Sequence, residues 1–283
     1  MFSVRQKMLI ARALNRAVVG TRRACGASAR VRCRRRGVRW DLDLDEGIDL
    51  SIYLLGAYEP RLLAAYRPLL RPGDVVWDIG ANIGAHTLHF ARLAGPTGRV
   101  LAFEPTDFAF AKLEANLALN PLLAARVEPH RLFLVDREAA PAPTTVFASW
   151  PVGRTGDAVD PEHLGRPMRL TTARAATGDA VAATAGLTRL DFVKLDVDGH
   201  ELAVLRGMRG VLGRFHPVLM MEIAPFVLDR ESPTALGDLL ALASDLGYAV
   251  HETGSRRPLP TDELALRRRI GRGGSLNVLL QPR

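Results

Sequence analysis

The sequence predicts an α/β fold built on a doubly wound, mostly parallel sheet. Three observations support this prediction. Apolar strand-like runs alternate with helical segments from about residue 74 onward, two of these runs end in a carboxylate, and a glycine-containing loop follows the first run. The two acids are Asp78 and Glu104, and the glycines are Gly80 and Gly84. Parallel strands bring such loops to one edge of the sheet, where ligands bind in this architecture.

The chain has 283 residues and a formal net charge of +8, which is concentrated near its N-terminus. Residues 1–40 hold 12 Arg and Lys side chains and no Asp or Glu, whereas the rest of the chain holds 26 basic and 30 acidic side chains. Nucleic-acid binding is therefore not predicted. Cys25 and Cys33 lie in the same basic tail. No disulfide framework or cysteine metal cluster is expected, and we predict a cytoplasmic protein.

The basic tail divides into a helical part and an arginine-rich part. Residues 2–19 place apolar side chains among basic ones at helical spacing, which predicts an amphipathic basic helix. Three interpretations stay open: a simple extension, a peripheral membrane or partner-docking helix through residues 1–20, and a transit peptide. Residues 30–37 hold five arginines and predict a solvated linker. We therefore expect an extension over residues 1–36 and one domain over residues 37–283.

The domain begins with alternating apolar and charged residues over 38–50, which suggest a strand or hairpin, and a helix over 59–70. The expected strands of the sheet cover residues 74–79, 99–104, 127–135, 190–197, 217–223, 248–251 and 276–280. The expected helices cover residues 84–94, 107–119, 201–215 and 233–246. The segment 137–178 is rich in proline, glycine and threonine, and one extra strand is expected over residues 144–148.

The loop after the first strand favours S-adenosyl-L-methionine over a dinucleotide. Its sequence is Gly80-x-Asn82-x-Gly84, which lacks the dinucleotide pattern G-x-G-x-x-G. Asp78 would repel a pyrophosphate, whereas S-adenosylmethionine carries an ammonium and a sulfonium and no phosphate. Glu104 is placed to accept hydrogen bonds from both ribose hydroxyls. The alternatives are an NAD-dependent oxidoreductase and a non-catalytic binding module docked through the basic N-terminus.

Four segments of the sequence contain motifs that together indicate a family resemblance. They are Ile52-Tyr53 with Gly56-Ala57-Tyr58-Glu59-Pro60, Asp78-Ile79-Gly80-Ala81-Asn82-Ile83-Gly84, Phe103-Glu104-Pro105, and Asp191-Phe192-Val193-Lys194-Leu195-Asp196-Val197-Asp198-Gly199-His200-Glu201. In these segments the chain resembles the FkbM family of S-adenosylmethionine-dependent methyltransferases, and the resemblance covers about residues 35–282. The chain departs from the family at Asp198, where glutamate is usual, and at Thr106, where asparagine is common.

The resemblance implies a class I, Rossmann-like methyltransferase with a seven-stranded sheet and S-adenosyl-L-methionine as cofactor. It implies cofactor contacts from residues of the first two strand ends and, near the adenine, from Asp136. The full set is Asp78, Gly80, Asn82, Gly84, Glu104 and Asp136. It also implies methyl transfer to a hydroxyl oxygen of a sugar-containing, lipid or secondary-metabolite acceptor.

The catalytic candidates follow strand 190–197, which we expect beside the first strand. Residues two apart in an extended segment share a face, so Asp196 and Asp198 are expected to point into one pocket, with His200 just beyond. Asp196 is predicted to line cofactor and substrate, and Asp198 or His200 to act as the base. Alternatively, Asp198 and His200 form a turn and a helix cap. No metal is predicted, although two Asp and one His would suffice for a Mg²⁺ or Mn²⁺ site, which stays an alternative. Glu59 and Glu222 are further candidates at the pocket edge.

Overall fold

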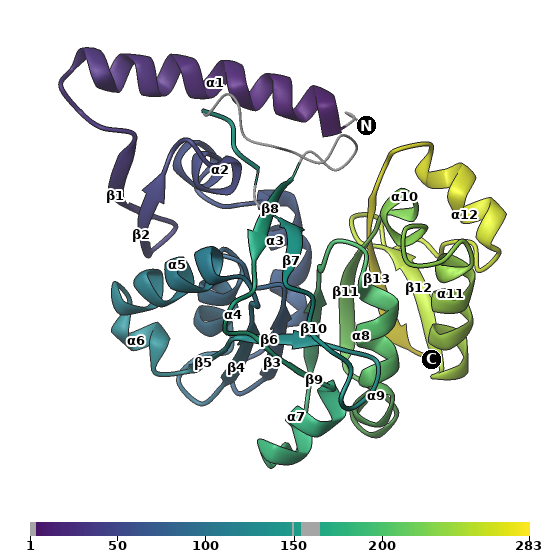
Figure 1. Ribbon diagram of the computed structural model, residues 1–283. Coiled ribbons are helices and arrows are strands. Elements are labelled where there is room, and N and C mark those ends of the chain that lie inside the picture. Colours follow the sequence, from purple (N-terminus) through teal and green to yellow (C-terminus); the bar gives the residue numbers. More distant parts are fainter. Residues whose placement is uncertain (1–3, 149, 154–164) are drawn as a thin grey trace.

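The central feature of the protein is a seven-stranded sheet (Figure 1). A computed structural model describes residues 4–148, 150–153 and 165–283. The strands are β3 (Val75–Ile79), β4 (Arg99–Phe103), β5 (Val127–His130), β10 (Phe192–Leu195), β11 (Val218–Ile223), β12 (Tyr248–Glu252) and β13 (Leu276–Pro282). Their order is β12-β13-β11-β10-β3-β4-β5, and β13 runs antiparallel to both of its neighbours while the other pairs are parallel. The predicted doubly wound sheet is confirmed.

Alternate side chains of the inner strands enter two separate cores, one on each face of the sheet. Trp77 and Leu101 belong to one core, and Val76 and Val100 belong to the other. The first core contains residues of α7 (Gly178–Thr184), α8 (Glu201–Gly207), α9 (Arg209–Phe215), α11 (Ala235–Asp245) and α12 (Glu263–Ile270). The second contains residues of α3 (Pro60–Tyr66), α4 (Thr87–Leu93) and α5 (Asp107–Ala118). Because both faces are covered, these strands are apolar almost throughout.

Strand β3 lies between β4 and β10, and the chain winds outward from this point in both directions. The register pairs Ile79 with Leu195 and with Phe103, so three strands end at the same level. The loops that begin at Gly80, Glu104 and Asp196 therefore meet at one edge. This is the adjacency that we expected for strand 190–197, and it is the usual ligand position in such sheets.

The N-terminal segment differs from the predicted linker. Helix α1 (Val4–Ala24) is followed by a hairpin of β1 (Arg30–Arg35) and β2 (Val38–Asp43), and then by α2 (Gly47–Leu55) (Figure 1). The linker prediction was wrong because it followed the arginine content and overlooked a strand-like alternation. Val31, Cys33 and Arg35 are half-buried, and the residues between them are exposed. The expected boundary between residues 36 and 37 falls in the hairpin turn.

Two further details differ from the expected elements. The strand expected over 127–135 divides, because the chain leaves the sheet after β5 and β6 (Leu132–Leu134) pairs with β9 (Arg174–Ala176). The helix expected over 201–215 breaks at Met208. The extra strand expected over 144–148 is confirmed as β7 (Thr145–Ala148), which pairs with β8 (Arg166–Arg169). The remaining short elements are η1 (Arg67–Leu69), α6 (Pro121–Ala124) and α10 (Pro225–Leu228). Within the described residues, every helix is too short or too polar to cross a bilayer.

Candidate active site

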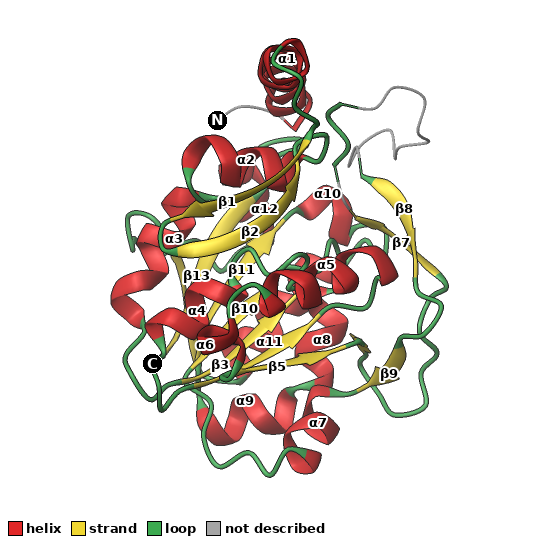
Figure 2. Ribbon diagram, turned by 90° about the vertical axis from the view of Figure 1, so that its left-hand side faces the viewer, coloured by secondary structure: helices red, strands yellow, loops and turns green. Residues whose placement is uncertain are grey.

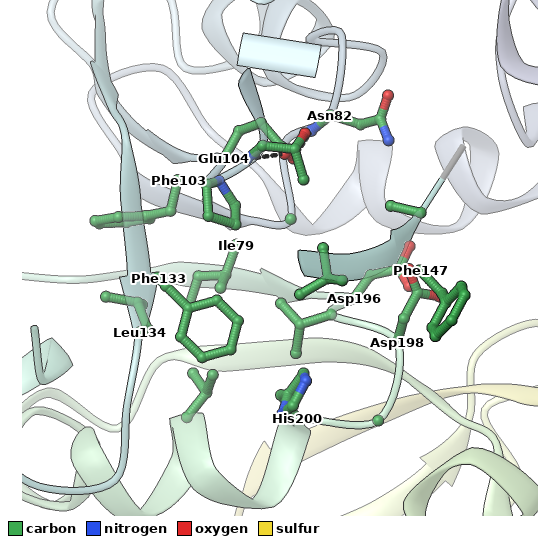
Figure 3. Close-up of a pocket in the computed structure, with 18 of the residues that line it drawn as sticks. Ile79, Asn82, Phe103, Glu104, Phe133, Leu134, Phe147, Asp196, Asp198 and His200 are labelled. Carbon is green, nitrogen blue, oxygen red and sulfur yellow. Dashed lines mark hydrogen bonds between the residues drawn. The ribbon is translucent and has the colours of Figure 1, made fainter. Parts of the chain in front are cut away.

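A cavity of about 330 Å³ opens at the carboxyl ends of β3, β4 and β10 (Figure 3). Its size falls in the range of small-molecule sites. The walls come from the loops after these strands and from β6 and β7. Of the predicted site residues, this cavity is lined by Gly80, Asn82, Glu104, Asp196, Asp198 and His200. We call it the cofactor cavity.

Gly80 allows two of these loops to pass each other. Its φ is +81°, and a Cβ built on it would lie 1.8 Å from the carbonyl oxygen of Asp196. Only glycine fits both the left-handed conformation and this close approach. The floor of the cofactor cavity therefore depends on the absence of one side chain.

Glu104 is fixed by hydrogen bonds to both of its carboxylate oxygens. One oxygen accepts from the Asn82 backbone N–H at 2.9 Å, and the other accepts from the Thr106 backbone N–H at 2.9 Å and from its hydroxyl. Burial raises the pKa of Glu104, and these hydrogen bonds oppose that shift. Each carboxylate oxygen retains further acceptor capacity, so Glu104 presents an oriented acceptor to the cavity.

Asp78 lies beneath the loop instead of on the cavity wall. Its side chain is fully buried, accepts a hydrogen bond from Thr87 Oγ1 at 2.6 Å, and lies 3.9 Å from Lys194 Nζ. Lys194 also lies 3.1 Å from Asp196. Burial lowers the pKa of Lys194, but Asp196 and Asp78 outweigh burial, so the pKa is raised and the ammonium stays charged. Lys194 therefore links the ends of β3 and β10.

Two other predicted cofactor residues stand away from the cofactor cavity. Gly84 has a φ of +85°, and a Cβ there would come within 2.8 Å of Leu113 Cδ1 on α5. Gly84 therefore serves the close packing of α5. The Asp136 carboxylate accepts a hydrogen bond from Arg137 at 3.1 Å, and Asp136 is not among the residues that line the cavity.

A second cavity of about 220 Å³ adjoins the first. The two cavities share Asp196, Asp198, Gly199 and Val227. Its other walls come from α1, α2, the segments around residues 58–59 and 150–152, and the ends of β11 and β13. We call it the acceptor cavity, because it meets the cofactor cavity along a wall that carries two carboxylates.

Five carboxylates line the acceptor cavity, and burial raises the pKa of two of them. The five are Glu59, Asp196, Asp198, Glu201 and Glu222. Burial, followed by the charge of Asp196, raises the pKa of Glu222 to about 8. Burial raises the pKa of Glu201 to about 7, although the backbone N–H groups of Val197 and Gly199 donate to its carboxylate. At neutral pH the carboxyl group of Glu222 is therefore mostly protonated.

The three predicted catalytic residues do not all line both cavities. Asp196 and Asp198 line both, whereas His200 lines only the cofactor cavity, where its ring packs edge-on against Phe133 (Figure 3). His200 Nδ1 lies 2.7 Å from Glu231 Oε1. Burial lowers the pKa of His200, but Glu231 outweighs it, so the net pKa is raised. His200 begins α8 but makes no side-chain cap hydrogen bond.

Comparison with known proteins identifies the family. Residues 78–250, more than half of the chain, match the sequence model of the methyltransferase FkbM domain. The chain belongs to the FkbM methyltransferase family. The sequence match supports the assignment to the family. The strand order of the sheet supports the assignment to the class I methyltransferase fold.

Three FkbM-type or related proteins illustrate the range of the similarity. The 31-O-demethyl-FK506 methyltransferase FkbM of Streptomyces tacrolimicus is 32% identical over 205 residues, which cover 64% of this chain and 75% of that protein. The hexuronic acid methyltransferase AglP of Haloferax volcanii is 31% identical over 139 residues, 49% of this chain and about half (52%) of that protein. The crystal structure of methyltransferase FkbM from Methylobacillus flagellatus superposes with a TM-score of 0.43 at 17% identity, and the match covers 77% of this chain and 50% of that one.

Sequence reasoning on this FkbM-family chain missed parts of both cavities. It did not identify Phe133 of β6 or Phe147 of β7, which line the cofactor cavity. It also missed Met8 and Ala11 of α1, which line the acceptor cavity. The alternation of arginine with Val31 and Cys33 was the available sequence signal that this segment forms a strand of the folded body. Glu59 and Glu222, expected at the pocket edge, do line the acceptor cavity.

Proposed function

We propose that this FkbM-family methyltransferase transfers the methyl group of S-adenosyl-L-methionine to a hydroxyl of a sugar-containing or secondary-metabolite acceptor. The carrying observation is the pair of adjoining cavities, which meet at Asp196 and Asp198 directly beyond the switch point of the sheet. A cofactor and an acceptor bound in these cavities would face each other across the shared wall. Positioning of this kind is a large part of catalysis.

The residues of the first cavity fit S-adenosylmethionine. Glu104 offers oriented acceptor capacity to ribose hydroxyls, and Phe133, Leu132 and Val204 form an apolar wall suited to a purine. When bound, the cofactor supplies a methyl group on a sulfonium. Asp78 contributes indirectly in this proposal, because its carboxylate helps to hold Lys194 beneath the loop.

Asp198 is the proposed base. Asp198 lines both cavities, so it stands where an acceptor hydroxyl would meet the cofactor. His200 is the less suitable base, because it does not line the acceptor cavity. Asp198 would accept the hydroxyl proton as the acceptor oxygen takes the methyl group. Asp196 would orient the acceptor with its remaining lone pairs.

The acceptor cavity supports a neutral, hydroxyl-rich acceptor. Carboxylates accept hydrogen bonds from hydroxyls, and protonated Glu222 and Glu201 also donate them. An anionic acceptor would meet the same negative charges that raise the pKa of Glu222, and it would lose affinity through like-charge repulsion. A neutral glycoside or polyol is therefore favoured over a uronic acid.

The first test is calorimetric titration of the whole protein with S-adenosylmethionine and S-adenosylhomocysteine. We expect micromolar binding that Glu104→Gln weakens about tenfold or more, because a charged hydrogen-bond acceptor is lost. The matched control is Glu114→Gln, which changes an exposed glutamate on α5 outside both cavities. Absence of binding to folded wild-type protein, or equal loss in both variants, would refute the cofactor assignment.

A further inference from the structure

Helix α1 carries an uncovered apolar face. It rests on the body through Met8, Asn15 and Val19, which are buried, and Asn15 donates hydrogen bonds to the Leu44 carbonyl and to Asp45. On the outer side, Leu9 is 67% exposed, Ile10 46% and Leu14 45%. Figure 2 views α1 nearly end-on, above α2 at the edge of the molecule.

An ordinary surface helix buries its apolar stripe and exposes a polar one, whereas α1 buries Met8 and Val19 and also exposes apolar side chains. Ile10, Leu14 and Ala17 follow the i, i+4, i+7 spacing, so they form one stripe opposite the buried residues. Ala13 and Ala17 are also exposed and extend the apolar surface. The helix therefore buries one face against the protein and presents a second apolar face outward.

One flank of this outer face is basic. Arg12, Arg16 and Arg23 share it, because Arg16 follows Arg12 by four residues and Arg23 follows Arg12 by eleven, which is about three helical turns. Residues 1–40 contain no carboxylate side chain that could neutralise these arginines from within the segment. An apolar stripe bordered by arginines is the pattern of a helix that lies in a membrane interface.

We propose that α1 docks the protein on the surface of an anionic lipid bilayer. The apolar face of Leu9, Ile10 and Leu14 enters the boundary between headgroups and acyl chains, while Arg12, Arg16 and Arg23 meet the lipid phosphates. A second copy of the chain fits this face less well, because it would bring identical basic flanks together.

Docking through this face would place the acceptor cavity close to the bilayer. Met8 and Ala11, on the inner side of the same helix, line that cavity. The cavity wall then lies about 10 Å from the lipid-facing surface, which is one helix diameter. The docking surface and the proposed acceptor site are thus two faces of one helix, although the docking proposal does not depend on methyl transfer.

The test is co-sedimentation of the full chain with phosphatidylcholine vesicles, prepared with and without phosphatidylglycerol. Wild-type protein is expected to bind the anionic vesicles, with binding that decreases as salt is added. The triple variant Leu9→Gln, Ile10→Gln, Leu14→Gln is expected to lower the partition coefficient about tenfold or more. The triple variant Arg12→Gln, Arg16→Gln, Arg23→Gln is expected to lower it by a similar factor on anionic vesicles only.

Two controls match these variants in chemistry but not in position. Leu122→Gln with Leu264→Gln removes exposed leucines from α6 and α12, and Arg256→Gln, Arg257→Gln with Arg272→Gln removes three exposed arginines elsewhere. Circular dichroism verifies that every variant is folded. The proposal is overturned if wild-type protein does not bind anionic vesicles, or if the control variants lose as much binding as the α1 variants do. It is also overturned if light scattering shows a dimer that the α1 apolar variant dissociates.

Discussion

The cofactor cavity and the acceptor cavity are built in different ways. The first is formed largely by loops that follow adjacent strands, and its key contacts are backbone approaches such as Gly80 against Asp196. The second is assembled from α1, α2, β11, α10 and the residue before β13, and it carries five carboxylates. One cavity is therefore set by local loop geometry and the other by tertiary packing and charge. The two cavities should respond differently to substitution.

The sharpest contrast lies between Asp198, which lines both cavities, and His200, which lines one. Asp198→Asn should lower kcat for methyl transfer about 100-fold or more, because a positioned base contributes that much or more. The left-handed backbone at Asp198 (φ 53°) tolerates asparagine, so the change is confined to chemistry. Steady-state kinetics with an acceptor found by screening would measure the effect.

His200→Gln provides the comparison. We expect it to raise KM for S-adenosylmethionine a few-fold and to leave most of kcat, because the ring contacts Phe133 and Glu231 beside the cofactor cavity. Glutamine keeps a hydrogen-bonding group for Glu231. A larger kcat loss in His200→Gln than in Asp198→Asn would transfer the base assignment to His200.

The second contrast concerns backbone approach in the cofactor cavity. Gly80→Ala should lower the free energy of unfolding by about 3 kcal/mol, because a left-handed alanine and an overpacked contact add their costs. The same variant should lose S-adenosylmethionine binding, since the Asp196 carbonyl must move to accommodate the new methyl group. Urea unfolding and calorimetric titration would measure the two effects.

Gly247→Ala isolates the backbone cost. Gly247 has a φ of +76° between α11 and β12, and nothing lies within 4 Å of a Cβ built there. We expect a loss of about 1 kcal/mol from the left-handed conformation alone, with cofactor binding unchanged. Equal losses in the two variants would show that the approach to Asp196 adds nothing.

The two cavities also differ in how far the sequence predicts them. The strand ends at Asp78, Glu104 and Asp196 were predictable because each motif lies within one short segment, and neighbouring parallel strands bring such segments together. The acceptor cavity was predictable only in fragments, such as Glu59 and Glu222. Its α1 wall depends on the docking of a basic helix through Asn15, which no local pattern indicates.

Some wall residues of the cofactor cavity were not predicted, because they too depend on contacts between distant parts of the chain. Phe133 lies in a segment that reads as one strand over 127–135, but β6 leaves the sheet and pairs with β9, more than 40 residues away in the chain. Hydrophobic alternation indicates that a strand forms, and it does not indicate its partner. Asp78 shows the converse case, because its place in the motif predicts a cofactor contact, whereas its side chain lies buried beneath the loop and does not line the cofactor cavity.

The last prediction tests the charge of the acceptor cavity. Burial and then Asp196 raise the pKa of Glu222 from 4.5 to about 8. The folded protein therefore keeps a proton that the unfolded chain releases, and wild-type stability falls as pH rises from about 4.5 to about 8. Glu222→Gln cannot titrate, so its stability relative to wild type should rise by about 1–3 kcal/mol between pH 5 and pH 8. Urea unfolding at several pH values would measure the difference.

Glu114→Gln is the matched control, because Glu114 is exposed on α5 and lies outside both cavities. Its stability difference from wild type should stay constant over the same pH range. A flat difference for Glu222→Gln would mean that the folded protein ionises Glu222 as readily as the unfolded chain does. The acceptor cavity would then hold more negative charge at neutral pH, and it would discriminate against anionic acceptors more strongly than proposed here.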